Sequence, residues 1–197
     1  MRRDELTELH YITAIANVPS ILSNGILCHN RVASIPHTDV SMAEVQDIRQ
    51  GKRVPGGDLL HNYANLYFSA RNAMLYKLLA RRNELAVLRV SPDVLDLPNV
   101  VISDGNAAVG FTGFAPAPVG LVIVDSDLTF AQRWTHADPY EYRRRKAACC
   151  AEVLVPRSVP AKYIEGAFVA SNLALRRFRA LDVDLPVSRR RHLFFLV

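Results

Sequence analysis

The chain has 197 residues, half of them apolar, and its net charge of +5 corresponds to a pI near 9.3. No apolar run approaches the roughly 18 residues of a membrane span, and the first residues, MRRDELTELHY, carry acids where a signal peptide is apolar. Composition therefore predicts a soluble, cytoplasmic protein without a membrane partner, folded as one domain over residues 1–197.

Short strands and short helices follow one another irregularly along the chain. Apolar runs of strand length, bounded by turn residues, predict strands at residues 8–13, 66–68, 85–90, 100–102, 120–124, 150–155, 163–169 and 192–197. Capping residues predict helices that begin after Asn17, at 42, at 73, after Asp127 (running to Trp134), after Asp138 and after Ser171. Because regular βαβ alternation is missing, the pattern predicts an α+β domain around a largely antiparallel sheet.

Local signals define the ends of the early helices. Asn17 is the expected N-cap of the first helix and Gly25 its end, and residues 28–38 are expected to form a loop. The sequence Ser-Met-Ala-Glu at 41–44 has the spacing of a capping box, which predicts a helix over 42–50. Arg49 falls in the last turn of that helix, where a cation also complements the helix dipole.

Residues 62–76 are the densest aromatic stretch of the chain. They predict a strand, a polar corner at 69–72 and a helix from 73 to about 82 with Asn72 as its cap. Three tyrosines, a phenylalanine, an arginine and a methionine around one corner suit a pocket for planar rings. Aromatic core packing is the alternative reading of the same residues.

Glu152 is a carboxylate inside the apolar run at 150–155. An ionised carboxylate in a buried strand costs free energy unless it is paired or faces a cleft. The residues alone leave three interpretations of Glu152 open. In the first two, it lies on the solvent side of an edge strand or pairs with Arg145 or Lys146. The third is a carboxylate held rigidly at the floor of a site, with the cations of 143–146 beside it.

The positive charge is clustered, and the cysteines are few. Basic clusters stand at residues 52–53, 81–82, 143–146, 176–179 and 189–191, a distribution that suits a polyanion or the phosphates of a dinucleotide. Ordinary solvated helix faces are the alternative. Three cysteines, Cys28, Cys149 and Cys150, without a CxxC spacing, predict neither a disulfide framework nor a metal site.

Several motifs, in order, resemble the DarT family of NAD-dependent DNA ADP-ribosyltransferase toxins. They are residues 10–13 (HYIT), 41–49, 55–57 (PGG) with 61–63 (HNY), 66–76 (LYFSARNAMLY), 103–105 (SDG) and 151–155 (AEVLV). The HYIT motif alone is weak evidence for the family, whereas the whole set in this order, over about three quarters of the chain, is specific to it. The resemblance implies an ADP-ribosyltransferase fold, an α+β core with a split, largely antiparallel sheet.

The same resemblance implies roles for individual residues. It implies Glu152 and Arg49 as catalytic residues. It implies NAD contacts at His10, Thr13, Gly25, Leu27, Arg49, Tyr67, Phe68 and Arg71. It implies nucleic-acid contacts at Arg53, Met74, Asn106, Arg143, Arg144 and Arg145. NAD is the implied co-substrate, and no metal is implied.

The implied activity is transfer of ADP-ribose from NAD to thymine or guanine in single-stranded DNA, with release of nicotinamide. A fixed carboxylate suits this reaction because it stabilises the oxocarbenium-like ribose that forms as nicotinamide leaves. The resemblance also implies that the protein is a toxin and that its partner is a macrodomain-type antitoxin. Asn106 stands where some relatives carry histidine, so the modified base stays open. Transfer to RNA or protein, and a non-catalytic basic nucleic-acid-binding module, remain as alternatives.

Overall fold

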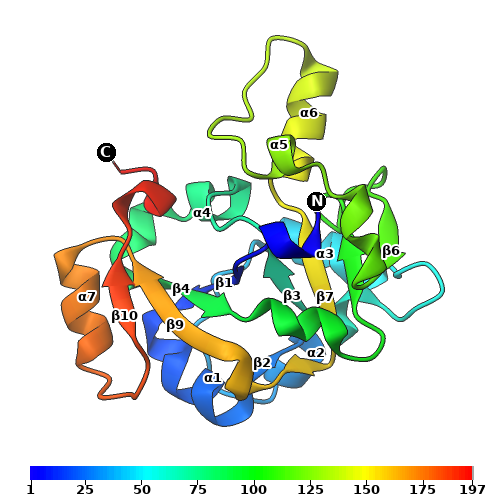
Figure 1. The fold of residues 1–197 in the computed structure, drawn as a ribbon. Coiled ribbons are helices and arrows are strands. Elements are labelled where there is room, and N and C mark those ends of the chain that lie inside the picture. The colour runs from blue at the N-terminus through cyan, green and yellow to red at the C-terminus, as the bar shows by residue number, and fades with distance from the viewer. Residues whose placement is uncertain (197) are drawn as a thin grey trace.

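The computed structural model describes residues 1–196 as an α+β structure built on one large sheet (Figure 1). Within these residues, eight strands form the sheet in the order β10-β9-β4-β1-β3-β7-β5-β6, and β2 and β8 form a separate pair. β10 runs parallel to β9, and the other neighbouring pairs of the sheet are antiparallel. The expected largely antiparallel α+β architecture is confirmed.

The strands and helices are short. The strands are β1 Leu9–Ala14, β2 Ile26–Leu27, β3 Tyr63–Tyr67, β4 Leu85–Val90, β5 Val101–Ser103, β6 Phe114–Pro116, β7 Glu152–Pro156, β8 Ser158–Val159, β9 Ile164–Val169 and β10 Val187–Arg189. The α-helices are α1 Val18–Asn24, α2 His29–Val32, α3 Ala43–Gly51, α4 Ala73–Lys77, α5 Ser126–Thr129, α6 Pro139–Ala148 and α7 Asn172–Arg179. The 3₁₀ helices are Arg3–Glu5, Ile15–Asn17, Leu60–Asn62, Leu79–Glu84, Pro92–Asp96, Val119–Ile123, Ala161–Tyr163 and Arg191–Phe194.

Three of the expected helix caps are confirmed, and those at Asp127, Asn17 and Ser41 are wrong. The side chains of Asn72, Asp138 and Ser171 accept hydrogen bonds from the first turns of α4, α6 and α7. Asn17 instead accepts from the amide of Thr38 and donates to its carbonyl. Ser41 is bonded to Asp39, so α3 forms without the expected capping box. Both side chains tie down the loop between α2 and α3 because they find partners there.

Several expected elements have a different form. The apolar run at 120–124 is a 3₁₀ helix in which Leu121 is buried and Val122 is 76% exposed, because a short apolar run does not distinguish strand from helix. The expected loop at 28–38 includes α2, and the helix expected after Asp127 is the short α5, which Asp125 caps. The helix expected over 73–82 divides into α4 and a 3₁₀ helix.

The expected C-terminal strand at 192–197 is also wrong over the described residues. Residues 191–194 form a 3₁₀ helix, and Phe195 then has a left-handed backbone with φ of 57°. A left-handed residue interrupts an extended ladder. Val197 lies outside the described residues. The last strand of the sheet is instead β10, which precedes this segment and pairs with β9.

The sheet separates between β1 and β3. β1 pairs with β4 along its whole length, from Leu9 opposite Val90 to Ala14 opposite Leu85. Its register with β3 is the single pair His10 and Tyr67 among the residues described. Because the two strands part beyond this pair, the sheet has the split that the family resemblance implies.

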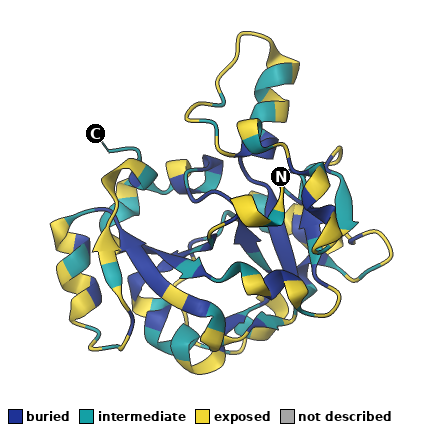
Figure 2. Cartoon of the chain, in the orientation of Figure 1, coloured by how far each residue is buried: buried dark blue, intermediate teal, exposed yellow. Residues whose placement is uncertain are grey.

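Both faces of the sheet are covered. Along β3, Leu66 lies in one apolar cluster with Phe68 just after it, whereas Tyr67 lies in a second cluster. Figure 2 shows the central strands as buried, while the excursion that carries α5 and α6 projects from the body with many exposed residues. The core therefore holds the central strands in place, whereas α6 projects from the body and is partly exposed to solvent.

Candidate active site

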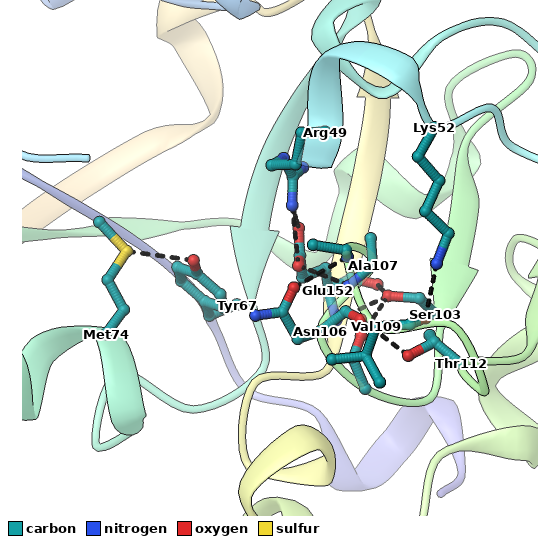
Figure 3. Close-up of polar contacts among 12 residues, drawn as sticks. Arg49, Lys52, Tyr67, Met74, Ser103, Asn106, Ala107, Val109, Thr112 and Glu152 are labelled. Atoms are coloured by element: carbon teal, nitrogen blue, oxygen red, sulfur yellow. Dashed lines mark hydrogen bonds and ion pairs between the residues drawn. The ribbon is translucent and has the colours of Figure 1, made fainter. Parts of the chain in front are cut away.

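Arg49 and Glu152 meet beside the centre of the sheet (Figure 3). Arg49 comes from the last turn of α3 and Glu152 from the first residue of β7. Arg49 Nη1 lies 3.1 Å from both carboxylate oxygens, Oε1 and Oε2. Arg49 is 6% exposed and Glu152 1% exposed. The pair meets the requirement that a buried charge be partnered. The solvent-side alternative is wrong because Glu152 is buried on an inner strand, and the other is wrong because Glu152 pairs with Arg49, while Arg145 contacts Glu141.

The loop after β5 holds the same carboxylate from the other side. The backbone amide of Ala107 donates to Glu152 Oε1 at 2.9 Å. The hydroxyl of Ser103 accepts from the amide of Glu152 at 3.3 Å and donates to the carbonyl of Gly105 at 2.7 Å. The backbone amide of Asn106 donates to the carbonyl of Ala147, and its side-chain Oδ1 accepts from the backbone amide of residue 108. Glu152 is therefore fixed by a backbone donor as well as by its partner cation.

Glu152 belongs to a row of polar side chains that crosses the sheet. The register places His10 opposite Tyr67, Tyr67 opposite Glu152, and Glu152 opposite Ser103. Residues paired directly in antiparallel strands project from the same face. The row therefore begins at the point where β1 and β3 separate and ends at the loop that bonds Glu152.

Tyr67 is a buried phenol between Glu152 and α4. Burial, and then the charge of Glu152, raise the pKa of Tyr67 well above its ordinary value, so the phenol stays protonated. Its hydroxyl donates to Met74 Sδ at 3.1 Å. Figure 3 shows this contact on the side of Tyr67 that faces α4. The contact connects the polar row to α4, the helix in which the family resemblance implies a nucleic-acid contact at Met74.

A cavity of about 610 Å³ opens at the split in the sheet. Tyr11 and Thr13 of β1 form one side, and Tyr63, Asn65 and Tyr67 of β3 form another. Its volume falls within the range of about 300–1,000 Å³ that is usual for ligand pockets. Of the residues expected to contact NAD or nucleic acid, the lining contains Thr13, Gly25, Leu27, Arg49, Tyr67, Met74, Asn106 and Arg143.

Other expected site residues lie outside this lining. His10 is bonded through Nδ1 to the carbonyl of Phe68 at 3.2 Å and through Nε2 to Glu8 at 3.1 Å. Phe68 is fully buried in the core. Arg71 donates to the carbonyl of His192 and lies 4.0 Å from the ring centroid of Phe195. His10 and Phe68 thus support the wall behind Tyr67, and Arg71 holds the C-terminal segment.

The remaining arginines expected to contact nucleic acid have acidic partners. Arg53 lies 3.6 Å from Asp58 and donates to the carbonyl of Gly57. Arg144 and Arg145 both contact Glu141, at 3.2 and 3.5 Å. The Arg53–Asp58 pair is solvent-exposed and the two pairs with Glu141 are partly exposed, so all three contribute little to stability. Their contact with nucleic acid stays a prediction.

Sequence reasoning missed several groups that line the cavity or lie near it. His29 and His61 stack with ring centroids 4.0 Å apart, and both line the cavity. Burial, and then the neighbouring His29 and Arg49, lower the pKa of His61. Lys52 extends to the carbonyl of Val109 at 2.5 Å, and burial followed by the charge of Arg49 lowers its pKa. The motif at 61–63 was the available signal for His61, while a backbone donor such as residue 107 has no side-chain signature.

The described residues were also compared with the requirements of a metal site and of a membrane-spanning helix. In residues 1–196, no group of three or more His, Cys, Asp or Glu side chains is arranged to hold a metal ion. No helix in this part of the chain is long and apolar enough to span a membrane. Cys28, Cys149 and Cys150 are free and buried.

Comparison with known proteins agrees with this geometry. A family model described as "ssDNA thymidine ADP-ribosyltransferase, DarT" matches residues 10–195. A DNA ADP-ribosyl transferase–DNA ADP-ribosyl glycohydrolase fusion protein of Thermosipho africanus is 33% identical over 96% of the chain, which spans about half (50%) of that relative. A DNA ADP-ribosyl transferase of Thermus sp. is 28% identical over 94% of the chain and 92% of the relative.

Solved structures share the whole fold. The T. africanus DarTG structure with ADP-ribose has a TM-score of 0.83 at 31% identity, covering 96% of the chain and 51% of that structure. The Thermus sp. DarT structure with ADP-ribosylated single-stranded DNA has a TM-score of 0.81 at 27% identity, covering 96% of both. The split sheet with a buried carboxylate at its centre defines an ADP-ribosyltransferase fold. The chain belongs to the DarT family.

Proposed function

We propose that this protein is an NAD-dependent transferase that places ADP-ribose on thymine in single-stranded DNA and releases nicotinamide. The observation that carries the proposal is the buried Arg49–Glu152 pair, of which Arg49 lines the cavity of about 610 Å³ while Glu152 lies directly behind it. The family description names a thymidine transferase, and the Thermus relative was solved with ADP-ribosylated single-stranded DNA. The family description favours thymine over the guanine that the sequence left open, and the Thermus structure supports single-stranded DNA as the acceptor.

The hydrogen bonds of Glu152 suit stabilisation of a developing ribose cation. An ionised carboxylate has about four acceptor positions. Oε1 accepts from Arg49 and from the amide of Ala107, and Oε2 accepts from Arg49 alone. Oε2 therefore retains acceptor capacity for a ribose hydroxyl, and its negative charge stabilises the ribose as nicotinamide leaves. The rigid β7 keeps that charge in place without reorganisation.

Arg49 orients the carboxylate and adds donors to the cavity. Its contact with Glu152 uses Nη1, so Nε and Nη2 remain for an NAD phosphate or for the carbonyl of the acceptor base. A thymine ring nitrogen must lose a proton to become a good nucleophile. Because arginine stays protonated, Glu152 is the proton acceptor in this scheme. Met74, which accepts a hydrogen bond from Tyr67 and lines the cavity, is the expected contact of the base in this scheme.

The direct test is transfer to defined oligomers. Wild-type protein is incubated with NAD and single-stranded DNA oligomers that hold one thymine or one guanine in an otherwise identical background. Mass spectrometry should detect one added ADP-ribose on the thymine oligomer, with free nicotinamide in equal amount. Glu152→Gln is the matched control because it keeps the shape of the side chain. Equal labelling of duplex DNA, RNA or protein would contradict the proposal, as would nucleic-acid binding without nicotinamide release.

We also propose that the protein acts in the cytoplasm as the toxin of a pair whose antitoxin is a macrodomain-type glycohydrolase. The T. africanus relative joins a transferase and a glycohydrolase in one chain, which supports such a partner. Induced expression should stop growth of a bacterial host, and co-expression of an ADP-ribosyl glycohydrolase domain should restore it. Growth arrest by the Glu152→Gln variant at equal expression would contradict a toxic role for the transfer reaction.

A further inference from the structure

A second hollow, of about 510 Å³, lies away from the catalytic cavity at the N-terminal end of α7. Two basic segments that are far apart in the sequence, at Arg82 and at 189–191, converge there on the start of α7. Its polar lining residues are Arg82, Arg189, Arg191, Asn83, Ser171 and Asn172. Its remaining lining residues are apolar, and none of the lining residues that the structure describes is acidic. Figure 1 shows α7 and β10 together at one edge of the sheet, with the C-terminal segment beside them.

Two arginines of this hollow, Arg82 and Arg189, are held by neutral groups. Arg189 Nη1 donates to Asn172 Oδ1 at 2.8 Å, and Arg82 Nη1 donates to the carbonyl of Leu79 at 3.2 Å. Neither arginine forms an ion pair with any residue in 1–196, whereas the adjacent Arg81 is paired with Glu84. Each guanidinium has five N–H donors. The two cations are thus oriented by the protein and retain both their charge and most of their donors.

The scaffold around the hollow is fixed. Ser171 Oγ donates to Asn83 Oδ1 at 2.6 Å, and Arg177 Nη1 donates to the carbonyl of Asn83 at 3.1 Å. These bonds join α7 to the 3₁₀ helix that carries Arg82. A planar guanidinium held in one orientation matches the oxygens of a phosphate group better than a mobile cation does. The first turn of α7, beside Asn172, adds a favourable potential for an anion.

The hollow is connected to the catalytic cavity through α4. Met74 and Lys77 line the cavity, and the chain then continues through a 3₁₀ helix to Arg82. Five residues at a rise of about 1.5–2.0 Å per residue cover roughly 8–10 Å. A single strand advances about 3.4 Å for each stacked nucleotide. A strand that leaves the cavity past Lys77 therefore reaches the hollow after about three nucleotides.

We propose that the hollow lined by Arg82 and Arg189 binds a backbone phosphate of the acceptor strand, outside the catalytic cavity. This proposal rests on the proposed function, since it takes the strand to be the acceptor. The site adds affinity for longer strands without reading a base, because phosphate contacts position a strand and base contacts specify it. Free inorganic phosphate offers the same chemistry, and the experiment separates the two sources.

The test compares two variants that lose the same charge. Arg82→Gln/Arg189→Gln removes the two cations of the hollow. Arg176→Gln/Arg179→Gln removes two cations of α7 that do not line it. Each is assayed with a thymine oligomer of about four nucleotides and one of about sixteen, which bracket the site sizes of single-strand binders. Binding of the long oligomer without NAD is measured at several salt concentrations.

The hollow variant should raise KM for the long oligomer roughly fivefold, leave kcat unchanged, and leave the short oligomer unaffected. Its log-log salt slope should be smaller in magnitude by about 0.7, because one phosphate of the strand is no longer neutralised. The control variant should behave like wild type on the short oligomer and retain the larger slope on the long one. Equal effects of the two variants would overturn the proposal, because they would reflect net charge alone.

A calorimetric titration with inorganic phosphate, against chloride at the same ionic strength, separates the two sources. Phosphate binding that the hollow variant loses, with no change in KM for the long oligomer, would overturn the strand assignment. Competition of phosphate with the long oligomer and not with the short one would support it. Failure of the proposed function is distinguishable, since wild type would then label no oligomer while strand binding and its salt slope remain measurable.

Discussion

Arg49 Nη1 bonds both carboxylate oxygens of Glu152 at 3.1 Å, across 103 residues of sequence and with both side chains buried. Because desolvation of each charge is offset by the other, neither residue is independent of its partner. Removing Glu152 alone leaves a buried cation, so the loss of activity in a Glu152→Ala variant would be accompanied by a loss of stability. The pair therefore requires tests that separate chemistry from folding.

The stability of the pair is tested by a double-mutant cycle. Arg49→Met and Glu152→Leu should each lower the free energy of unfolding by about 3–5 kcal/mol, because each leaves one buried charge unpaired. The double variant should be destabilised by much less than the sum of the two, and all three should be inactive. Urea denaturation at neutral pH measures the free energies. Additive effects would show that the two charges do not interact in the folded protein.

Replacement of Arg49 by lysine tests the guanidinium itself. Arg49→Lys keeps the positive charge beside Glu152 and loses the planar fork that leaves Nε and Nη2 for substrate. We expect kcat/KM to fall at least about tenfold, while the protein stays more stable than Arg49→Met. Steady-state kinetics with NAD varied, combined with thermal denaturation, provide both readouts. The exposed Arg53→Lys serves as control, and full activity of Arg49→Lys would assign Arg49 a purely electrostatic role.

Acid stability should depend on Glu8, the partner of His10. The hydrogen bond from His10 is the main cause that lowers the pKa of Glu8 to about 2 from 4.5, and Arg89 adds a second bond. Since the folded-state pKa is depressed, Glu8 stabilises the fold above about 4.5, and this contribution is lost as the pH falls toward 2. Glu8→Gln should flatten the dependence of unfolding free energy on pH in that window. Glu165→Gln, an exposed carboxylate of β9, should leave the dependence unchanged.

Gly25 should be intolerant of a side chain. It ends α1 with φ of 80°, and a Cβ there would collide with the carbonyl oxygen of Val159. Gly25→Ala should therefore lower the free energy of unfolding by about 1–3 kcal/mol and weaken NAD binding at the same edge of the cavity. Gly51→Ala is the matched control because a Cβ there meets nothing within 4 Å. Equal melting temperatures for the two variants would contradict this account.

Asn106 and Met74 should have different effects on catalysis. The Asn106 side chain accepts a hydrogen bond from the backbone amide of Ala108. The residue between them, Ala107, donates its backbone amide to Glu152. Asn106→Ala should therefore lower kcat, because it loosens the donor to Glu152. Met74→Leu keeps the volume and loses the sulfur that Tyr67 bonds, so it should change the KM for the oligomer or the base preference more than kcat. Single-turnover and steady-state assays with thymine and guanine oligomers distinguish the two patterns.

Local signals in the sequence predicted the elements whose ends are chemically marked. Asn72, Asp138 and Ser171 begin helices because their side chains accept from the first turn. β4 and β9 have the length and composition of buried strands. The prediction was wrong at 120–124 and 192–197 because a short apolar run has no period that separates strand from 3₁₀ helix. There the surrounding packing decides the backbone.

The sequence alone determined that a carboxylate in an apolar strand needs a partner, a cleft or solvent, because the cost of burying a charge depends on residue type and burial. Only the tertiary structure decided that the partner is Arg49 and that the amide of Ala107 shares Oε1. The same holds for Arg82 and Arg189, which meet in one hollow although 107 positions separate them (189 − 82). Such neighbours depend on how β1, β3 and α7 pack, and the packing of distant segments has no local signature in the chain.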